Sequence, residues 1–216
     1  MGRKKVHGEQ VRGQLLERAG EIVSFEGEAG LSLRRLAGET GTSTTAVYSL
    51  FGSKAGLVHA LHTEALTRFA QFMRTVEYTG DLLEDLARLS RAYRASAHAD
   101  PHYYRVIFGG DYPDELDPDL QRLAAETFAP LVDVVRRCID EGVFVAAKPV
   151  HVAHSLWAAV HGLVSLEIGG FGNSEVDDDG VFESGVRAQF RGWCRETEPR
   201  LSTVDGRSGV AGPAAG

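Results

Sequence analysis

The 216-residue chain has only two cysteines, Cys138 and Cys194, and it has no apolar run of the roughly 20 residues that a bilayer-spanning helix needs. Two cysteines are too few for a disulfide framework, which favours a reducing, cytoplasmic environment. The basic N-terminus is not followed by an apolar stretch, so it is not expected to act as a secretory signal. We therefore expect a cytoplasmic protein without a membrane partner.

Motifs for metal binding, nucleotide binding and nucleophilic catalysis are also missing. Three histidine pairs have a spacing that a metal could use, but none has a nearby cysteine or a defined third ligand. These pairs are His59 with His62, His98 with His102, and His151 with His154. No phosphate-binding glycine loop and no nucleophile elbow is present. We expect no metal, no cofactor and no catalytic residue; the alternative is an all-helical enzyme with His161 as its acid–base group, for which no partner carboxylate can be identified.

Charge is distributed unevenly along the chain. The net charge of −7 by itself argues against a nucleic-acid partner. Residues 1–60, however, carry eight basic and six acidic side chains, whereas the remainder carries 15 basic and 24 acidic ones. A mildly basic segment on an acidic body is typical of a protein that touches phosphate groups with one end only.

Helical periodicity dominates the sequence, and no segment alternates long enough to found a sheet. The nearest approach to a strand is the short run 143–145. The apolar stripes and turn residues predict an all-α protein of about nine helices. Pro130 lies inside one predicted helix, where we expect a kink or a split. Beyond residue 197 glycine, serine, proline and alanine prevail, so 197–216 is predicted to be a disordered tail.

Residues 31–61 contain two short helical patterns followed by a long one. Ser32 is placed to cap the first, Gly41 supplies a tight turn, and Ser53 is placed to cap the long helix. Small polar residues stand at the start of the second short helix, where a recognition helix meets base edges and phosphates. The spacing predicts a helix-turn-helix.

This segment resembles the TetR family of bacterial transcription factors over about residues 9–62. The matching residues are Leu36, Ala37, Gly41, Val47, Tyr48, Phe51, Lys54 and Leu57. The resemblance implies a three-helix helix-turn-helix DNA-binding domain with a basic N-terminal arm over 1–54. It further implies a helical regulatory and dimerisation domain over 55–196.

The resemblance also implies which residues contact DNA. Tyr48 and Lys54 would contact phosphates, Ser32 would contact the DNA backbone, and Arg34 could reach a guanine edge. The start of the recognition helix would present Ser43, Thr44, Thr45 and Ser49, the last three as specificity positions. An arm along the backbone or minor groove would contain Arg3, Lys4 and Lys5. The alternatives are packing for Tyr48, plain solvation for Lys54 and disorder for the arm.

The C-terminal half resembles the body of WHG-type members of the family, through Trp157, His161 and Gly162. This implies a homodimer in which two helices, about 150–168 and 179–195, form a four-helix bundle with a second copy. The residues expected at the dimer interface are Leu156, Val160, Leu163, Phe182, Val186 and Phe190. The alternative is that these residues form an intramolecular core.

A ligand pocket is expected between the body helices, because aromatic residues gather there beside one imidazole. The expected lining residues are Phe69, Phe72, Met73, Tyr93, Tyr104, Phe108, Trp157 and His161. His161 would either contact a flat ligand or tie its helix to a neighbouring backbone carbonyl beside Gly162. Together these features predict a repressor that a small, largely apolar effector releases from a palindromic operator in double-stranded DNA. The alternative within the family is a regulator without a small-molecule ligand, which activates or responds to a protein partner.

Overall fold

The computed structural model describes residues 2–109, 117–171 and 177–195, with side chains from residue 8 onward. Within these ranges the chain forms nine helices and no sheet, which confirms the all-α prediction. The helices are α1 (Gly2–Gly30), α2 (Leu33–Glu39), α3 (Thr44–Phe51), α4 (Lys54–Arg74), α5 (Leu82–Ala99), α6 (Pro101–Phe108), α7 (Pro118–Asp140), α8 (Pro149–Ile168) and α9 (Asp178–Trp193). The predicted tail, residues 197–216, lies outside the described residues.

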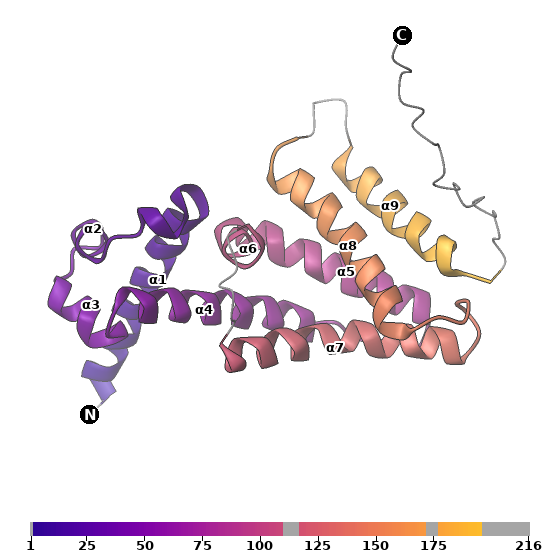
Figure 1. Ribbon diagram of the computed structural model, residues 1–216, viewed down its shortest axis with the longest axis horizontal. Helices are drawn as coiled ribbons and strands as arrows, with labels where there is room; N and C mark the ends of the chain where they lie inside the picture. Colours follow the sequence, from indigo (N-terminus) through magenta and orange to yellow (C-terminus); the bar gives the residue numbers. More distant parts are fainter. Residues whose placement is uncertain (1, 110–116, 172–176, 196–216) are drawn as a thin grey trace, which may run out of the picture.

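The molecule is elongated, with α2 and α3 at one end and α8 and α9 toward the other (Figure 1). Helix α4 runs between the two ends and belongs to both. We use "head" for α1, α2, α3 and the N-terminal half of α4, and "body" for the rest of α4 with α5 to α9. None of the described helices is long and apolar enough to cross a membrane.

Serine N-caps begin each of α2, α3 and α4. Ser32, Ser43 and Ser53 each accept, through the side-chain oxygen, a hydrogen bond from the backbone N–H three residues later, with N···O distances of 3.5, 3.1 and 3.0 Å. Such a cap satisfies a donor that the first helical turn leaves without a partner and contributes about 1 kcal/mol. Between α2 and α3, Gly41 has a φ of 66°, a left-handed conformation that glycine adopts without steric cost. The predicted caps Ser32 and Ser53 and the turn at Gly41 are confirmed.

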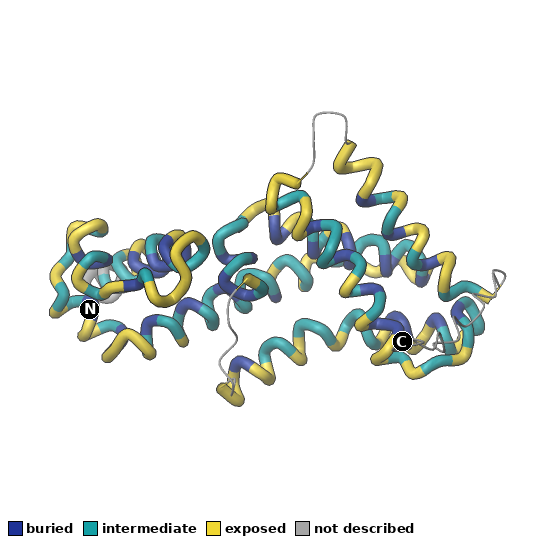
Figure 2. The backbone as a smooth tube through the Cα atoms, turned by 45° about the horizontal axis from the view of Figure 1, so that its top comes forward, coloured by how far each residue is buried: buried dark blue, intermediate teal, exposed yellow. Residues whose placement is uncertain are grey.

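Buried apolar side chains form two cores, one in the head and one in the body. Figure 2 shows the buried positions recurring along the helices between exposed ones. The head core combines residues of α1 to α4 with Tyr103, Val106 and Ile107 from α6. Phe69 of α4 and Phe108 of α6 pack against both cores. Helix α6 therefore joins the head to the body.

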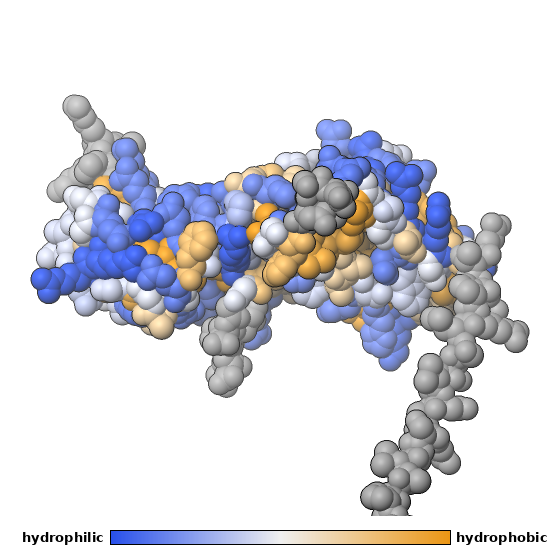
Figure 3. All heavy atoms as spheres, turned by 90° about the horizontal axis from the view of Figure 1, so that it is seen from above, coloured by the Kyte–Doolittle hydropathy of each residue, from blue (hydrophilic) through white to orange (hydrophobic). Residues whose placement is uncertain are grey.

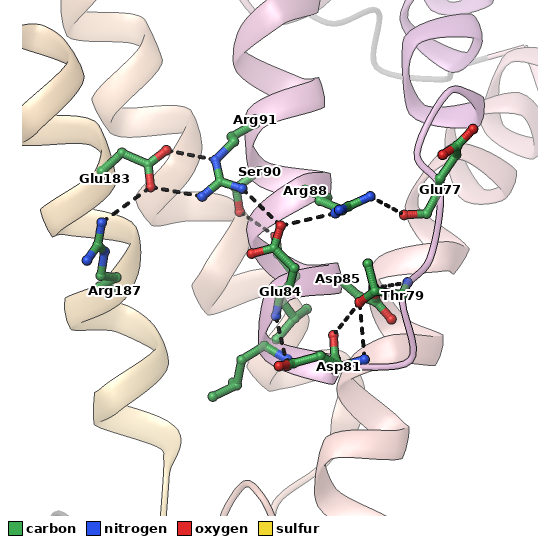
Figure 4. A network of polar contacts seen from close by, with 12 residues as sticks. Glu77, Thr79, Asp81, Glu84, Asp85, Arg88, Ser90, Arg91, Glu183 and Arg187 are labelled. Carbon is green, nitrogen blue, oxygen red and sulfur yellow. Dashed lines mark hydrogen bonds and ion pairs between the residues drawn. The ribbon is translucent and has the colours of Figure 1, made fainter.

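The turn between α4 and α5 is held by Asp85, whose side chain is buried. Its carboxylate accepts hydrogen bonds from the Thr79 backbone N–H at 2.7 Å, the Thr79 hydroxyl at 2.9 Å and the Gly80 N–H at 3.4 Å (Figure 4). Burial by itself would raise the pKa of Asp85, but these hydrogen bonds favour the carboxylate and hold its pKa below the ordinary value. Further along α5, Arg91 pairs with Glu183 of α9 at 2.8 Å, so α5 is anchored at its start and tied to α9.

Two local features of α7 and its C-terminal loop refine the sequence prediction. Helix α7 passes through Pro130 as one helix, so the predicted split does not occur. Proline removes one backbone hydrogen bond from a helix, and packing of α7 against α4, α5 and α8 offsets that loss. After α7, Phe144 forms an isolated antiparallel bridge with Cys194, which ties this loop to the end of α9.

The junction of α3 and α4 yields a test of the fold at Gly56. A Cβ at Gly56 would lie against the backbone carbonyl oxygen of Phe51, which cannot move without shifting the end of α3. We expect Gly56→Ala to lower the free energy of unfolding by about 1–3 kcal/mol, the usual cost of overpacking. The control is Gly38→Ala in α2, where a Cβ meets no atom within 4 Å and alanine should stabilise the helix by up to about 1 kcal/mol. Urea unfolding of both variants measures the difference, and equal unfolding curves would contradict the prediction.

Candidate functional site

The exposed face of α3 carries small polar side chains and one tyrosine. Tyr48 is 53% exposed, and Thr45 and Ser49 are also exposed, whereas Val47 and Phe51 are buried in the head core. Ser43 is exposed at the helix start, and Thr44 is partly buried. Seen from above, the head is mainly hydrophilic, and hydrophobic side chains gather nearer the middle of the molecule (Figure 3). The helix register thus directs most of the predicted specificity residues to solvent.

Apart from Arg12, which lies over the Phe51 ring, the described basic side chains of the head fall into two groups. Arg35 donates to Glu26 at 2.6 and 2.8 Å and to Glu39 at 2.7 Å, and Arg18 donates to Glu39 at 2.6 Å. Hydrogen bonds from these two guanidinium groups hold the pKa of Glu39 below its ordinary value.

The second group is exposed and has no ion pair among the described residues. It consists of Arg34 at the start of α2 and Lys54 at the start of α4. Ser32, which precedes α2, is exposed beside Arg34. These two cations are therefore available to an external anion such as a phosphate group. The backbone at Lys4 and Lys5 belongs to α1, and their side chains lie outside the described residues.

A cavity of about 320 Å³ lies inside the body. Five of the eight predicted ligand residues line it: Phe69, Met73, Tyr93, Phe108 and Trp157. The Phe69 ring meets the rings of Tyr93 and Phe108 edge to face, with centroids 5.3 and 6.2 Å apart, whereas Phe108 is tilted against Tyr93 and Trp157. Phe72, Tyr104 and His161 are not part of the cavity wall, which corrects their assignment. Phe72 does not line the cavity, because α4 presents the neighbouring Phe69 and Met73 to it instead.

Helix α7 contributes part of the wall that sequence reasoning did not assign. Ala124, Thr127, Phe128 and Leu131 line the cavity from α7, together with His154 of α8. The rings of Phe128 and His154 meet edge to face with centroids 4.7 Å apart. The apolar stripe of α7 predicts a buried face, but it does not reveal which helix lies opposite.

His161 ties α8 to α5 and α6. Its Nδ1 lies 2.9 Å from the hydroxyl oxygen of Tyr93 and 3.0 Å from that of Tyr104. Burial lowers the pKa of His161 and raises the pKa of Tyr104. Of the two roles that the sequence leaves open, this geometry supports the structural tie, although the partners of Nδ1 are phenol hydroxyls and not the expected backbone carbonyl.

The residues predicted for the dimer interface lie mainly inside the chain's own body core. Five of the six are buried there: Leu156, Val160, Phe182, Val186 and Phe190. A side chain that is already buried offers no area to a second copy, so the assignment of these five is wrong. Leu163 is partly exposed, yet it packs close to Gly185 of α9, where a Cβ would lie 2.9 Å from Leu163 Cδ1.

Charged and aromatic residues join α1 to α4 and α6. Arg68 of α4 pairs with Glu17 of α1 at 2.6 Å, and His102 Nε2 of α6 lies 3.0 Å from the same carboxylate. The Arg68 guanidinium lies over the Tyr103 ring, 4.4 Å from its centroid. At the same crossing, a Cβ on Gly20 would lie 3.0 Å from the His102 ring. This head–body junction leaves little room for α1 to move independently of α6.

Comparison with known proteins places these features among transcriptional regulators. The family described as "Tetracyclin repressor-like, C-terminal domain" matches residues 86–189. An uncharacterized HTH-type transcriptional regulator of Mycobacterium tuberculosis is 26% identical over 190 residues, which are 86% of this chain and 83% of the relative.

Two solved structures extend the comparison to three dimensions. The structure of a protein named as regulatory, SCO4313, is 30% identical, with a TM-score of 0.70 over 88% of this chain and 98% of that one. The structure of AibR in complex with isovaleryl coenzyme A and operator DNA has the same TM-score over 83% of this chain and 98% of that one. Its identity of 15% makes this a likeness of fold alone.

The tie through His161 predicts a pH-dependent loss of stability. We expect His161→Phe to lower the free energy of unfolding at pH 8 by about 1–3 kcal/mol, because the imidazole Nδ1 that lies within hydrogen-bond distance of the buried Tyr93 and Tyr104 hydroxyls is lost. Folding lowers the pKa of His161, so the unfolded chain binds the proton more readily. The wild type then loses this contribution as pH falls through the ordinary histidine pKa of about 6.5.

The difference between variant and wild type should therefore narrow toward pH 5.5, in urea unfolding at one protein concentration. The control is His151→Phe on the exposed face of α8, which should stay within about 0.5 kcal/mol of wild type. If His161→Phe has the same free energy of unfolding as the wild type at pH 8, the structural role of His161 is contradicted.

Proposed function

The chain belongs to the TetR family of transcriptional regulators, and we propose that it is a dimeric repressor that a small, largely apolar ligand releases from a palindromic operator. One observation carries the proposal: Ile107 of α6 belongs to the head core and also lines the body cavity. A ligand in the cavity therefore contacts a residue on which the position of the head depends. AibR, solved with both a coenzyme A ester and operator DNA, supports a regulator of this fold that binds both kinds of partner.

In the proposed complex with DNA, α3 lies in the major groove. Tyr48 and Lys54 contact phosphates, the first by its hydroxyl and the second by its charge. Thr45 and Ser49 face base edges, and Arg34 reaches a guanine edge or a phosphate from the start of α2. The exposure of all five side chains supports this assignment.

Release of DNA follows from a change in the distance between the two heads of the dimer. Two α3 helices must lie roughly 34–36 Å apart to enter successive major grooves. A ligand that binds better to a body whose heads are differently spaced weakens DNA binding, and DNA weakens ligand binding by the same factor. The path runs from the cavity through α6 and α4 to the head–body junction at Glu17, Arg68 and His102.

The proposed dimer surface is the outer face of α8 and α9. Ala158 of α8 and Ser184 and Ala188 of α9 are exposed, and a Cβ on Gly162 would meet no atom within 4 Å. Small exposed side chains let two helices pack at short axial distance. Leu166 is 55% exposed and adds apolar area. A two-fold axis through this face gives a self-complementary interface and leaves the two heads free for DNA.

The phosphate contacts are tested with Lys54→Ala and Tyr48→Phe. Each variant should weaken binding to operator and to random duplex DNA by a similar factor, because phosphate contacts carry no sequence information. Loss of the lysine should also lower the salt dependence of log K by about one unit per half-site. Fluorescence anisotropy at several salt concentrations measures both effects, with Arg136→Ala on the exposed side of α7 as the control. An altered base preference at unchanged affinity would argue against this assignment.

The dimer surface is tested with Ala188→Glu. Wild type should sediment at about twice the chain mass of 23.4 kDa, whereas the variant should sediment as a folded monomer, because a carboxylate would be buried without a partner. Ala129→Glu places the same change on an exposed position of α7 and should leave the dimer intact. A wild-type monomer that binds a palindromic operator tightly would refute the dimer.

A further inference from the structure

The wall of the body cavity carries no charged side chain. None of the described residues that line it is an aspartate, glutamate, lysine or arginine. Burying a charge without a counter-charge costs several kcal/mol. A ligand with a charge attached directly to its buried part would therefore lose much of its affinity, whatever the sign of the charge.

Three polar side chains of the wall, Ser90, Thr127 and His154, direct their hydrogens to backbone carbonyl oxygens. Ser90 donates its hydroxyl to the Leu86 carbonyl oxygen at 2.9 Å, and Thr127 donates to the Leu123 carbonyl oxygen at 2.7 Å. His154 Nδ1 lies 2.9 Å from the Val150 carbonyl oxygen. Because a carbonyl oxygen only accepts, Nδ1 carries the hydrogen and Nε2 of the neutral ring is an acceptor. These three side chains can accept a hydrogen bond from a ligand without giving up a contact of their own.

The size and the rings of the cavity indicate the shape of the ligand. A dry cavity of about 150 Å³ in another protein holds one benzene, so the 320 Å³ found here match about two rings, or about 12 non-hydrogen atoms. Phe69 and Phe108 meet edge to face, as do Phe128 and Trp157, with centroids 6.2 and 6.1 Å apart. Aromatic faces and edges that line a cavity in this way favour an aromatic guest.

We infer that the cavity takes an uncharged, flat molecule of about two aromatic rings that donates a hydrogen bond to the wall. The inference rests on the proposed function, because it names the class of effector for that same site. The inferred ligand differs from that of AibR, because the coenzyme A ester bound to AibR is far larger and carries phosphate groups. The wall described here has no lysine or arginine to pair with them.

Three probes that share a two-ring aromatic frame test charge and hydrogen bonding separately. They are 2-naphthol, which is uncharged and donates; quinoline, which is uncharged and only accepts; and 2-naphthoate, which is anionic at neutral pH. Isothermal titration calorimetry of the full chain should give at least about 100-fold tighter binding for 2-naphthol than for 2-naphthoate. Quinoline should bind about 3- to 10-fold more weakly than 2-naphthol, the value of one hydrogen bond. Equal affinity for 2-naphthoate or quinoline, or no binding of 2-naphthol, overturns the inference.

Two matched variants locate the binding. Ala124→Phe fills the cavity from α7 and should lower the affinity for 2-naphthol at least tenfold, whereas Ala129→Phe, on the exposed side of the same helix, should not. Unchanged affinity in a folded Ala124→Phe variant places the binding elsewhere and overturns the inference. If that variant does not fold, the order of affinities of the three probes for the wild type still tests the inference.

Operator release by 2-naphthol, followed by anisotropy, separates this inference from the proposed function. Binding with the expected ranking but without release supports the inference about the cavity and contradicts release by its ligand. Binding with release supports both.

Discussion

One short helix, α6, belongs to two hydrophobic cores, and the relation between head and body depends on it. Tyr103 and Val106 are buried among head residues, whereas Phe108 reaches the body cavity. On the side of α6 that faces the head, Arg68 forms an ion pair with Glu17 of α1 and a cation–π contact with Tyr103 of α6. The Tyr103 hydroxyl is buried without a hydrogen-bond partner among the described residues, which costs about 1–3 kcal/mol. In the proposed mechanism, a ligand shifts this junction only by the difference between its affinities for the two arrangements of head and body.

The body contains polar contacts that hold its helices together and a cavity between those helices. Asp85 fixes the turn between α4 and α5, and His161 draws α5, α6 and α8 together through two phenol hydroxyls. Between these anchors the side chains leave a cavity of about 320 Å³. Protein interiors are usually packed as closely as organic crystals, so the side chains that line this cavity make fewer contacts than they would in a filled core. In the proposed function, a ligand makes contacts with these side chains, and its occupancy of the cavity is thereby linked to the arrangement of the helices around it.

Much of the head could be predicted because its signals are local. Serine caps, the glycine turn and the helical spacing of Val47 and Phe51 depend on neighbours a few residues away, and they determine the register of α3. Once that register is known, the exposure of Thr45, Tyr48 and Ser49 follows. The assignment of these residues to DNA remains a prediction, as does the domain boundary at residue 54. The helix order of the body was predictable for the same local reason.

The sequence by itself determined that the chain is all-helical and which side of α3 meets solvent. It did not determine the start of α1, which begins at Gly2 within the segment expected to be an arm. Only the tertiary structure decided which side of α8 faces inward, because that helix is apolar nearly all round and its pattern marks no single face. Leu156 and Val160 therefore proved to be core residues, and the small residues around Gly162 proved to be exposed. In the same way, the tie of His161 and the share of α7 in the cavity wall depend on which helices become neighbours. That choice is made by the packing of distant segments, on which local periodicity carries no information.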